Sequence, residues 1–194
     1  MKTYIKCNSA EYDSVGNELT PQQTIFFKNS KIRNSRGQLL VCYHSTYSEF
    51  DIFDKAQIGS GSGGNFGSGF YFTSKRSLAE QYGNNTLICY LNITNPFDYM
   101  RYGANREVLE LMQKDGYQFT SEDIQICNED YSEDTYDIVD IIWNNGYSSV
   151  DFSNCLIAAG YDGIFVGDEI IAFVPNQIKA ISNKKPTVSE SIYA

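Results

Sequence analysis

Histidine and metal-ligand spacings are scarce in this chain. His44 is the only histidine among 194 residues, and the five cysteines form no pair separated by two residues; they stand at positions 7, 42, 89, 127 and 155. Zinc sites combine several Cys and His ligands at short spacings, so we expect no metal. The odd number of cysteines gives no disulfide framework, which is typical of a chain made in the reducing cytoplasm.

Long apolar runs are also missing. The opening residues, Met1 to Lys6, lack the apolar core of a signal peptide, and no apolar segment is long enough to span a bilayer. We therefore expect no membrane partner. Export by a route that needs no signal peptide stays open, so the expected site of action is the cytoplasm of the producing cell or of an infected or target cell.

Positive charge is in deficit. The chain has 15 basic and 24 acidic residues, a formal net charge of −9, which argues against a general nucleic-acid binder but does not exclude a small basic groove. Between Lys114 and Lys179 there is no lysine or arginine, whereas thirteen acidic residues fall there. We expect a helical insertion over residues 98–160 with a solvated acidic face. The alternative is a docking surface for a basic partner.

The length of 194 residues favours one domain over residues 1–194. The spacing of its apolar residues predicts both helices and strands, and we expect an α+β fold. Residues 1–20 look irregular, Thr20 and Pro21 are typical of a helix start, and residues 185–194 look like a frayed polar tail. A helix is expected over 75–82. Strands are expected at 38–44, 70–73, 86–93, 161–166, 170–174 and 177–181.

A glycine-rich stretch precedes the strand at 70–73. From Gly59 to Gly69, six of eleven residues are glycine and three are serine, which is typical of a loop. Glycines let backbone N–H groups approach phosphates, but the Gly-Lys-Ser/Thr ending of a P-loop is absent, so nucleoside triphosphate hydrolysis is disfavoured. A mobile connector is the plain interpretation. The position just before Tyr71 favours a flap over a ligand.

Three separate predicted strands carry side chains that could hold one ligand: His44, Tyr71 and Glu169. Each has an ordinary structural interpretation as well, as a core histidine, a strand residue or a solvated strand-end charge. Tyr71 alternates with Phe70 and Phe72, so it faces away from the side that those two bury. Gln177 is a further polar candidate, for which a structural role is expected. No serine or cysteine hydrolase signature accompanies the histidine.

These segments resemble the ADP-ribosyltransferases of the His–Tyr–Glu class, which includes poly(ADP-ribose) polymerases and diphtheria toxin. The run from Phe66 to Tyr82 is similar to the second motif of that class, Tyr43-His44-Ser45-Thr46 to the first, and Glu169 to Ile178 to the third. The resemblance is strongest to the ADP-ribosyltransferase domains of phage and mobile-element polyvalent proteins. It covers roughly Gln22 to Pro96 and Gly160 to Ile181, and it leaves out the acidic helical segment.

The resemblance implies a fold and a site. The fold would be a split, mainly antiparallel β core around an NAD cleft, with NAD as substrate. His44 would bind ribose hydroxyls, the backbone of Ser45 would hold the carboxamide, and Glu169 would bind the ribose 2′-hydroxyl. Tyr71 and Tyr82 would stack on the nicotinamide ring. Thr46 and Gly69 would complete the set of NAD-binding residues.

Two positions depart from the family pattern. Ser45 stands where glycine is usual, so its side chain must avoid the ligand, and Ala79 stands where the polymerases have a serine that binds the carboxamide. The implied activity is mono-ADP-ribosyl transfer to an unidentified macromolecular acceptor, which we expect to be protein rather than nucleic acid. The alternatives are an NAD glycohydrolase and a non-catalytic module that binds NAD or ADP-ribose.

Overall fold

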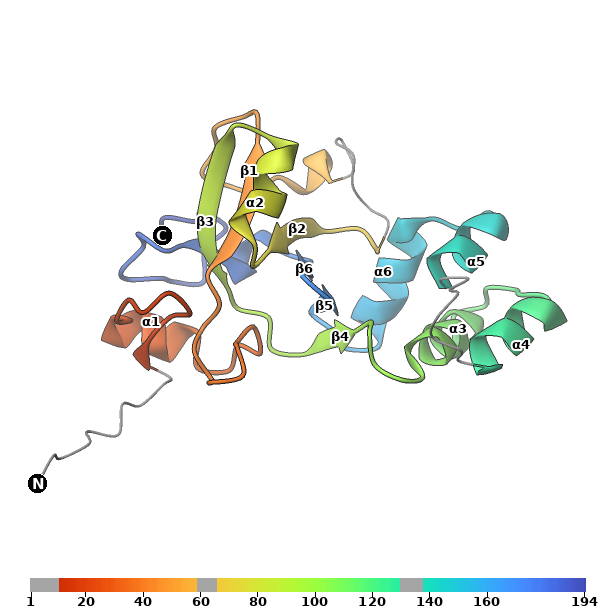
Figure 1. Ribbon diagram of the computed structural model, residues 1–194. Coiled ribbons are helices and arrows are strands. Elements are labelled where there is room, and N and C mark those ends of the chain that lie inside the picture. The colour runs from red at the N-terminus through yellow and green to blue at the C-terminus, as the bar shows by residue number, and fades with distance from the viewer. Residues whose placement is uncertain (1–10, 59–65, 130–137) are drawn as a thin grey trace, which may run out of the picture. The chain divides into compact units, whose positions relative to one another are not determined.

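The computed structural model describes residues 11–58, 66–129 and 138–194 (Figure 1). The chain divides into two compact units, each assembled from segments that are distant in sequence. Unit 1 comprises residues 1–53, 72–94 and 175–194, and unit 2 comprises residues 54–71 and 95–174. Within the described ranges, no helix has both the length and the apolar character needed to cross a membrane.

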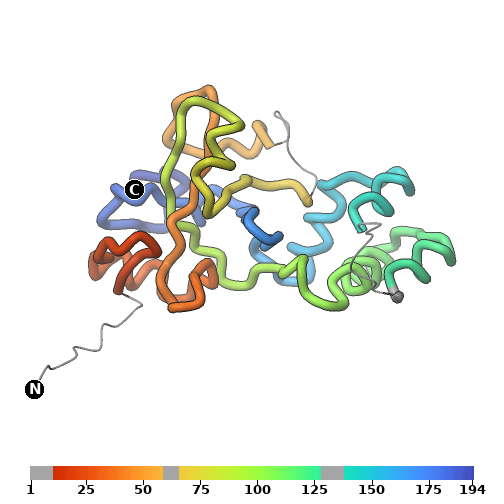
Figure 2. Tube along the Cα trace, viewed as in Figure 1, coloured from red at the N-terminus to blue at the C-terminus, as the bar shows by residue number. Residues whose placement is uncertain are grey.

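Unit 1 is organised around an antiparallel pair of strands. Strand β1, Cys42–Thr46, pairs along its whole length with β3, Asn85–Leu91, and the two run side by side in the trace of Figure 2. Strand β3 also pairs antiparallel with β7, Ile178–Ala180, and β1 pairs with β2, Phe70–Thr73, at Tyr43 and Thr73. His44 and Ser45 therefore lie on a strand that is hydrogen-bonded to its neighbours.

Helix α1, Pro21–Phe26, begins where the sequence predicts. The Thr20 hydroxyl accepts a hydrogen bond from the Gln23 backbone N–H, and the Gln23 side chain accepts one from the Thr20 N–H, which together form a capping box. The helix packs beside a small core in which the rings of Phe27 and Tyr90 meet edge to face, 5.5 Å apart. The buried members of this core are Leu19, Phe27, Leu39, Val41 and Tyr90.

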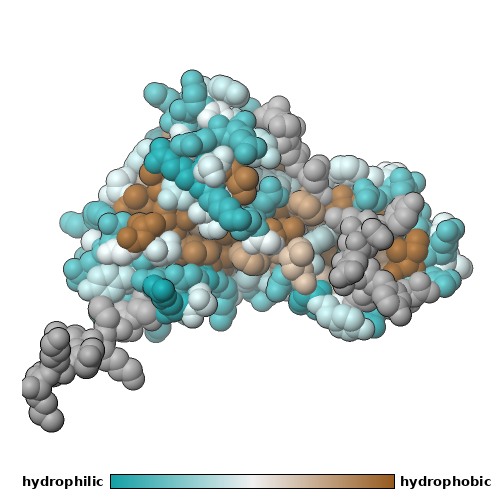
Figure 3. Space-filling view, in the orientation of Figure 1, coloured by the Kyte–Doolittle hydropathy of each residue, from teal (hydrophilic) through white to brown (hydrophobic). Residues whose placement is uncertain are grey.

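The predicted helix over 75–82 is two short helices, α2 at Arg76–Ala79 and the 3-10 helix η3 at Glu80–Tyr82. Ala79 is buried, whereas Arg76, Ser77 and Leu78 are exposed, and the surface around α2 in Figure 3 is mostly hydrophilic with a hydrophobic patch. The change to 3-10 geometry tightens the last turn before β3, which is common at helix ends. The 3-10 helix ends at Tyr82, shortly before β3.

Unit 2 contains a small mixed sheet. Strand β4, Pro96–Asp98, runs parallel to β5, Gly163–Val166, which pairs antiparallel with β6, Glu169–Ala172. In the β5–β6 hairpin Val166 stands opposite Glu169, so the loop has two residues. Its first residue, Gly167, has a φ of +57°, which the tight hairpin turns require and glycine adopts freely.

Helices supply most of the regular secondary structure described in unit 2. Besides the 3-10 helix η2, Lys55–Gln57, the described residues of this unit form four α-helices, which are α3 at Ala104–Lys114, α4 at Ser121–Glu129, α5 at Ile138–Asn144 and α6 at Ser149–Ala158. They share one core with the sheet, built from residues such as Val108, Phe152 and Ile171. The expected helical character of 98–160 is confirmed within the described part. Residues 130–137 of that range lie outside it.

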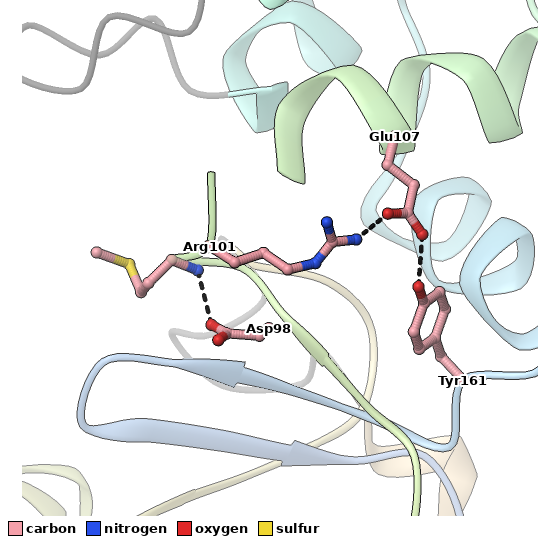
Figure 4. Close-up of polar contacts among 5 residues, drawn as sticks. Asp98, Arg101, Glu107 and Tyr161 are labelled. Carbon is pink, nitrogen blue, oxygen red and sulfur yellow. Dashed lines mark hydrogen bonds and ion pairs between the residues drawn. The ribbon is translucent and has the colours of Figure 1, made fainter. Parts of the chain in front are cut away.

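A polar cluster in unit 2 joins α3 to the segment that follows β4 and to the segment that precedes β5. Glu107 on α3 forms an ion pair with Arg101, which follows β4, and accepts a hydrogen bond from the hydroxyl of Tyr161, which precedes β5 (Figure 4). Asp98 accepts a hydrogen bond from the Met100 backbone N–H and closes the intervening turn. One carboxylate thus fixes the start of α3 to both neighbouring segments.

The C-terminal residues differ from the expected frayed tail, and that expectation is wrong. Ile192 is fully buried, and its backbone exchanges hydrogen bonds with Asp51 and Ala180. The buried ammonium of Lys179 donates to the carbonyls of Ser189 and Ser191, at 2.7 and 2.8 Å. The polar composition of residues 185–194 predicts a frayed end, whereas in the structure the burial of Ile192 and the hydrogen bonds of Lys179 hold this segment in place.

The α+β class is confirmed, and strand positions agree with the predictions within a few residues. The first strand begins later than expected, at Cys42 rather than Gln38, because, of residues 38–41, Leu39 alone forms bridges, and these are isolated ones to Asp13 and Arg33. The short strand β4, which Pro96 opens, is not among the predicted strands. The assignment of residues 1–194 to a single domain stays a prediction.

Candidate functional site

The His44 ring lies among three phenylalanines of unit 1. Its centroid is 5.0 Å from Phe53 in an edge-to-face arrangement, 5.5 Å from Phe72 and 6.4 Å from Phe50. Edge-to-face aromatic contacts contribute about 0.5–1.5 kcal/mol each beyond simple burial. His44 is half-buried, and the contacts with these rings restrict the orientations of its imidazole, which suits a group that orients a ligand.

Ser45 and Thr46 follow at the end of β1. The Ser45 side chain is 6% exposed, and its hydroxyl lies 2.8 Å from the Thr86 hydroxyl on the neighbouring strand. The Ser45 side chain, which the glycine of the family pattern lacks, is therefore occupied by a contact within the sheet. The Thr46 hydroxyl accepts a hydrogen bond from the Ser48 N–H, and so shapes the turn after the strand.

Tyr82 lies beside the same end of β1, because the next residue, Gly83, packs directly against the backbone of Thr46. A Cβ on Gly83 would lie 2.3–2.5 Å from the backbone of Thr46, whereas nonbonded atoms do not approach so closely. The φ of Gly83 is 169°, an extended value open to any residue, so the need for glycine is purely one of space. Tyr82 itself is 54% exposed, which leaves its ring available for a ligand.

Tyr71 belongs to unit 2 and packs, half-buried, against its core, whereas Phe70 and Phe72 are buried, as the alternation predicts. Its hydroxyl donates to the Gly67 carbonyl at 2.6 Å and accepts from the Phe66 N–H at 3.2 Å. The tyrosine therefore fixes the end of the glycine-rich loop. Residues 59–65, where most of the predicted flap falls, lie outside the described residues.

Two glycines of that loop end are needed for close packing in unit 2. A Cβ on Gly69 would meet Ile171 at 2.5 Å and the Ala172 carbonyl oxygen at 2.8 Å, so β2 begins directly against β6. A Cβ on Gly67 would meet Ile164 and Ser153, each at 2.8 Å. Gly69, expected among the ligand-binding residues, thus has a packing role in the structure.

Glu169 opens strand β6 immediately after the hairpin turn. Its side chain is partly buried, and this burial raises the pKa of its carboxyl above the ordinary value, because a carboxylate loses solvation there. No ion pair compensates the charge within the described residues. A poorly solvated carboxylate interacts more strongly with a developing positive charge or a hydroxyl donor than one in bulk water does.

The predicted site residues fall into two groups. Unit 1 brings together His44, Ser45, Thr46 and Tyr82, whereas unit 2 holds Gly69, Tyr71 and Glu169. Gln177 is buried and ends the 3-10 helix η4, Pro175–Gln177, directly before β7, and its backbone carbonyl accepts a hydrogen bond from the Asn92 N–H. The structural role expected of its side chain stays a prediction.

The aromatic contacts of His44 and the close approach of Gly83 to Thr46 were not predicted from the sequence. Phe50 and Phe53 lie in a segment without regular periodicity, and only their aromatic density offered a signal. Gly83 directly follows the helix expected over 75–82, and in the sequence it has no feature that distinguishes it from a glycine that ends a helix. No group of three or more potential metal ligands occurs within ranges 11–58, 66–129 and 138–194.

Comparison with known proteins gives the family. Residues 34–188 match the family model described as ADP-ribosyltransferase in polyvalent proteins. The match covers most of the chain and includes segments of both units, so the chain belongs to this family of ADP-ribosyltransferase domains. The predicted class and its ADP-ribosyltransferase-like fold are thereby confirmed. Domains of this kind use NAD as their substrate.

Two further comparisons add little. A solved structure described as the crystal structure of an anti-CRISPR protein is 15% identical, with a TM-score of 0.37, over 69% of this chain and 89% of that one. So low a TM-score carries no argument about fold or function. No protein with a curated description matches the sequence.

Proposed function

We propose that the protein is a mono-ADP-ribosyltransferase that transfers ADP-ribose from NAD to a macromolecular acceptor, with release of nicotinamide. The acceptor we propose is a protein. The observation that carries this proposal is the partly buried Glu169 at the head of β6, in a chain that belongs to an ADP-ribosyltransferase family. The order of His44, Tyr71 and Glu169 along the chain supports it.

Glu169 has the main chemical role in this proposal. The bond between nicotinamide and the ribose C1′ breaks, nicotinamide leaves with the electron pair, and the sugar becomes oxocarbenium-like. A carboxylate that accepts a hydrogen bond from the 2′-hydroxyl stabilises this positive charge. The acceptor nucleophile then bonds to C1′ and gives up its proton, for which Glu169 is also the candidate base.

The remaining residues position NAD. His44, held by its phenylalanine neighbours, hydrogen-bonds ribose hydroxyls, and the backbone of Ser45 binds the carboxamide. The contact between the Ser45 and Thr86 hydroxyls supports the role of the Ser45 backbone, because it directs the Ser45 side chain toward β3. The rings of Tyr71 and Tyr82 stack on nicotinamide. Positioning of this kind lowers the barrier without any further chemical group.

The test compares three proteins, the parent, Glu169→Gln and Glu110→Gln, incubated with NAD and a host-cell lysate. Glu110 is an exposed glutamate of α3, so its variant is a matched control for the loss of one carboxylate from unit 2. We expect the parent and the control to release nicotinamide and to label protein with ADP-ribose. Glu169→Gln should lose about 100-fold or more of the turnover.

Each other outcome has a definite meaning. Equal turnover by Glu169→Gln refutes the role of the carboxylate. Release of nicotinamide with only free ADP-ribose as the second product identifies an NAD glycohydrolase. Tight NAD binding with no turnover, whatever acceptor is supplied, identifies a non-catalytic binding module.

A further inference from the structure

Unit 1 has an open pocket of about 770 Å³ that none of the roles above uses. We call it the basic pocket, and it is lined by Lys28, Asn29, Ser30, Lys31, Arg33, Asn34 and Thr94. All seven residues are polar and three are cationic. Its volume is within the usual range of ligand sites, but most such sites are lined by apolar and aromatic side chains.

Arg33 gives the basic pocket a fixed frame. Its guanidinium donates hydrogen bonds to three backbone carbonyls, those of Phe27, Ser30 and Gly37, at 2.8–3.0 Å. These bonds tie the end of α1 to the turn at residues 35–37. Arg33 therefore contributes positive charge to the pocket while its donors hold the surrounding chain in place.

Lys28 and Lys31 are the cations left for a ligand. Both are exposed, and within the part of the chain that the structure describes no ion pair involves either one. The amides of Asn29 and Asn34 and the hydroxyl of Thr94 border the same space. Two unpaired ammonium groups beside neutral donors suit an anion with several oxygens, such as a phosphate group.

The basic pocket is separate from the candidate NAD-binding residues of unit 1. It lies at one end of β3, where the Ser30 hydroxyl donates to the Leu91 carbonyl and the Lys31 N–H to that of Ile93. Ser45 contacts Thr86 near the other end of the same strand. Five residues of a strand span about 17 Å, so one small ligand does not fill both places.

The charge of the chain is divided unequally between the units. Unit 1 contains 11 basic and 7 acidic residues, a net charge of +4, whereas unit 2 contains 4 basic and 17 acidic residues, a net charge of −13. The overall charge of −9 conceals a positive unit. Four of its cations fall within nine residues, Lys28 to Arg36, a segment that has no acidic residue.

We propose that the basic pocket binds the phosphate backbone of a nucleic-acid strand, and that the protein thereby docks on nucleic acid through unit 1. None of the residues that line the pocket is aromatic, so they offer no ring on which a base could stack, and contacts go to phosphates and sugars and carry no sequence preference. The acidic unit 2 repels a polyanion, which confines binding to unit 1. Docking is independent of NAD chemistry.

The test measures the anisotropy of a fluorescein-labelled oligo-dT as the protein is added, over a series of salt concentrations. The variant is Lys28→Gln with Lys31→Gln. The control is Lys55→Gln with Lys114→Gln, which removes the same charge from exposed positions of unit 2. For single strands each phosphate contact contributes about 0.7 to the slope of log affinity against log salt, so the variant slope should fall by about 1.4. The control and Glu169→Gln should bind as the parent does.

Several results would overturn the proposal. One is the absence of salt-dependent oligo-dT binding by the parent, and another is an equal loss in the variant and the control. Displacement of the strand by polyglutamate as readily as by unlabelled oligo-dT would show general attraction of anions in place of phosphate recognition. Melting curves of both double variants verify folding, and a variant that melts as the parent does but keeps full affinity also refutes the assignment.

Discussion

The substitution Gly83→Ala tests whether space at one glycine holds Tyr82 beside β1. The added methyl group would lie 2.3–2.5 Å from the Cα, C and O atoms of Thr46. These are backbone atoms of a strand paired along its length with β3, so no flexible side chain can move aside. Either the segment from Tyr82 to Gly83 or the end of β1 must shift.

The sign of the stability change is the informative part. At an unstrained extended position, Gly→Ala stabilises a protein by about 0.4–1 kcal/mol, because the unfolded chain loses freedom. The φ of Gly83 is such a value, so without the clash the variant would be more stable. Overpacking costs about 1–3 kcal/mol, which exceeds that gain. We therefore expect a net loss of up to about 2.5 kcal/mol.

The assays are thermal unfolding by far-UV circular dichroism and NAD binding by calorimetry. A protein of this size loses about 2–4 °C in Tm per kcal/mol, so the expected decrease is several degrees. NAD affinity should fall as well, because Tyr82 and Thr46 move apart. The control is Gly116→Ala in unit 2, where a Cβ meets nothing within 4 Å but φ is +96°. Its strain should cost about 1–2 kcal/mol without changing NAD affinity. A Gly83→Ala protein with raised Tm and unchanged NAD binding would refute the reasoning.

Three further substitutions probe other contacts. Tyr71→Phe keeps the ring but removes both hydrogen bonds to the loop end, so amide exchange at Phe66 should accelerate; an unchanged rate would contradict the role of the hydroxyl. Burial raises the pKa of Glu169, so the native state holds this proton more tightly than the unfolded chain does, and stability falls as pH rises through the window between the two pKa values. Glu169→Gln should therefore melt above the parent at neutral pH and lose this advantage in acid, and parallel pH curves would contradict the shift. Lys179→Met removes the donors that bind the Ser189 and Ser191 carbonyls, so limited proteolysis should cut the C-terminal segment faster than in the parent, and equal rates would show that Ile192 alone docks it.

Local signals in the sequence predicted local structure well. Thr20 and Pro21 mark the start of α1 because a hydroxyl and a fixed φ satisfy the first helical turn without help from the rest of the chain. The strands predicted at 161–166 and 170–174 are likewise found, as the β5–β6 hairpin, whose two-residue turn Gly167 permits because glycine adopts a positive φ. These predictions depend on neighbours within a few residues, which are all visible in the sequence.

The features that the sequence did not predict depend on contacts between segments that are distant in the chain. Gly83 looks like any glycine after a helix, and only the approach of Thr46, 37 positions earlier, shows that its missing side chain is what matters. The C-terminal residues look disordered until Lys179 and Asp51 are brought beside them. Polar composition predicts exposure on average, but one buried hydrogen-bonding group can reverse it.

The single histidine illustrates the division between sequence and structure. Its place in a motif, together with Tyr71 and Glu169, is a property of sequence order, and that order was enough to identify the family, because chemistry constrains which residue types occur. The tertiary structure decided what surrounds each of them: phenylalanines around His44, a loop tied to Tyr71, and partial burial that raises the pKa of Glu169. It also decided that a chain of net charge −9 has a positive unit, because folding gathers charges that are dispersed along the sequence. The sequence alone fixes the identity of each residue. Its burial, the electrostatic field around it and the atoms that approach it depend on which segments of the chain pack together.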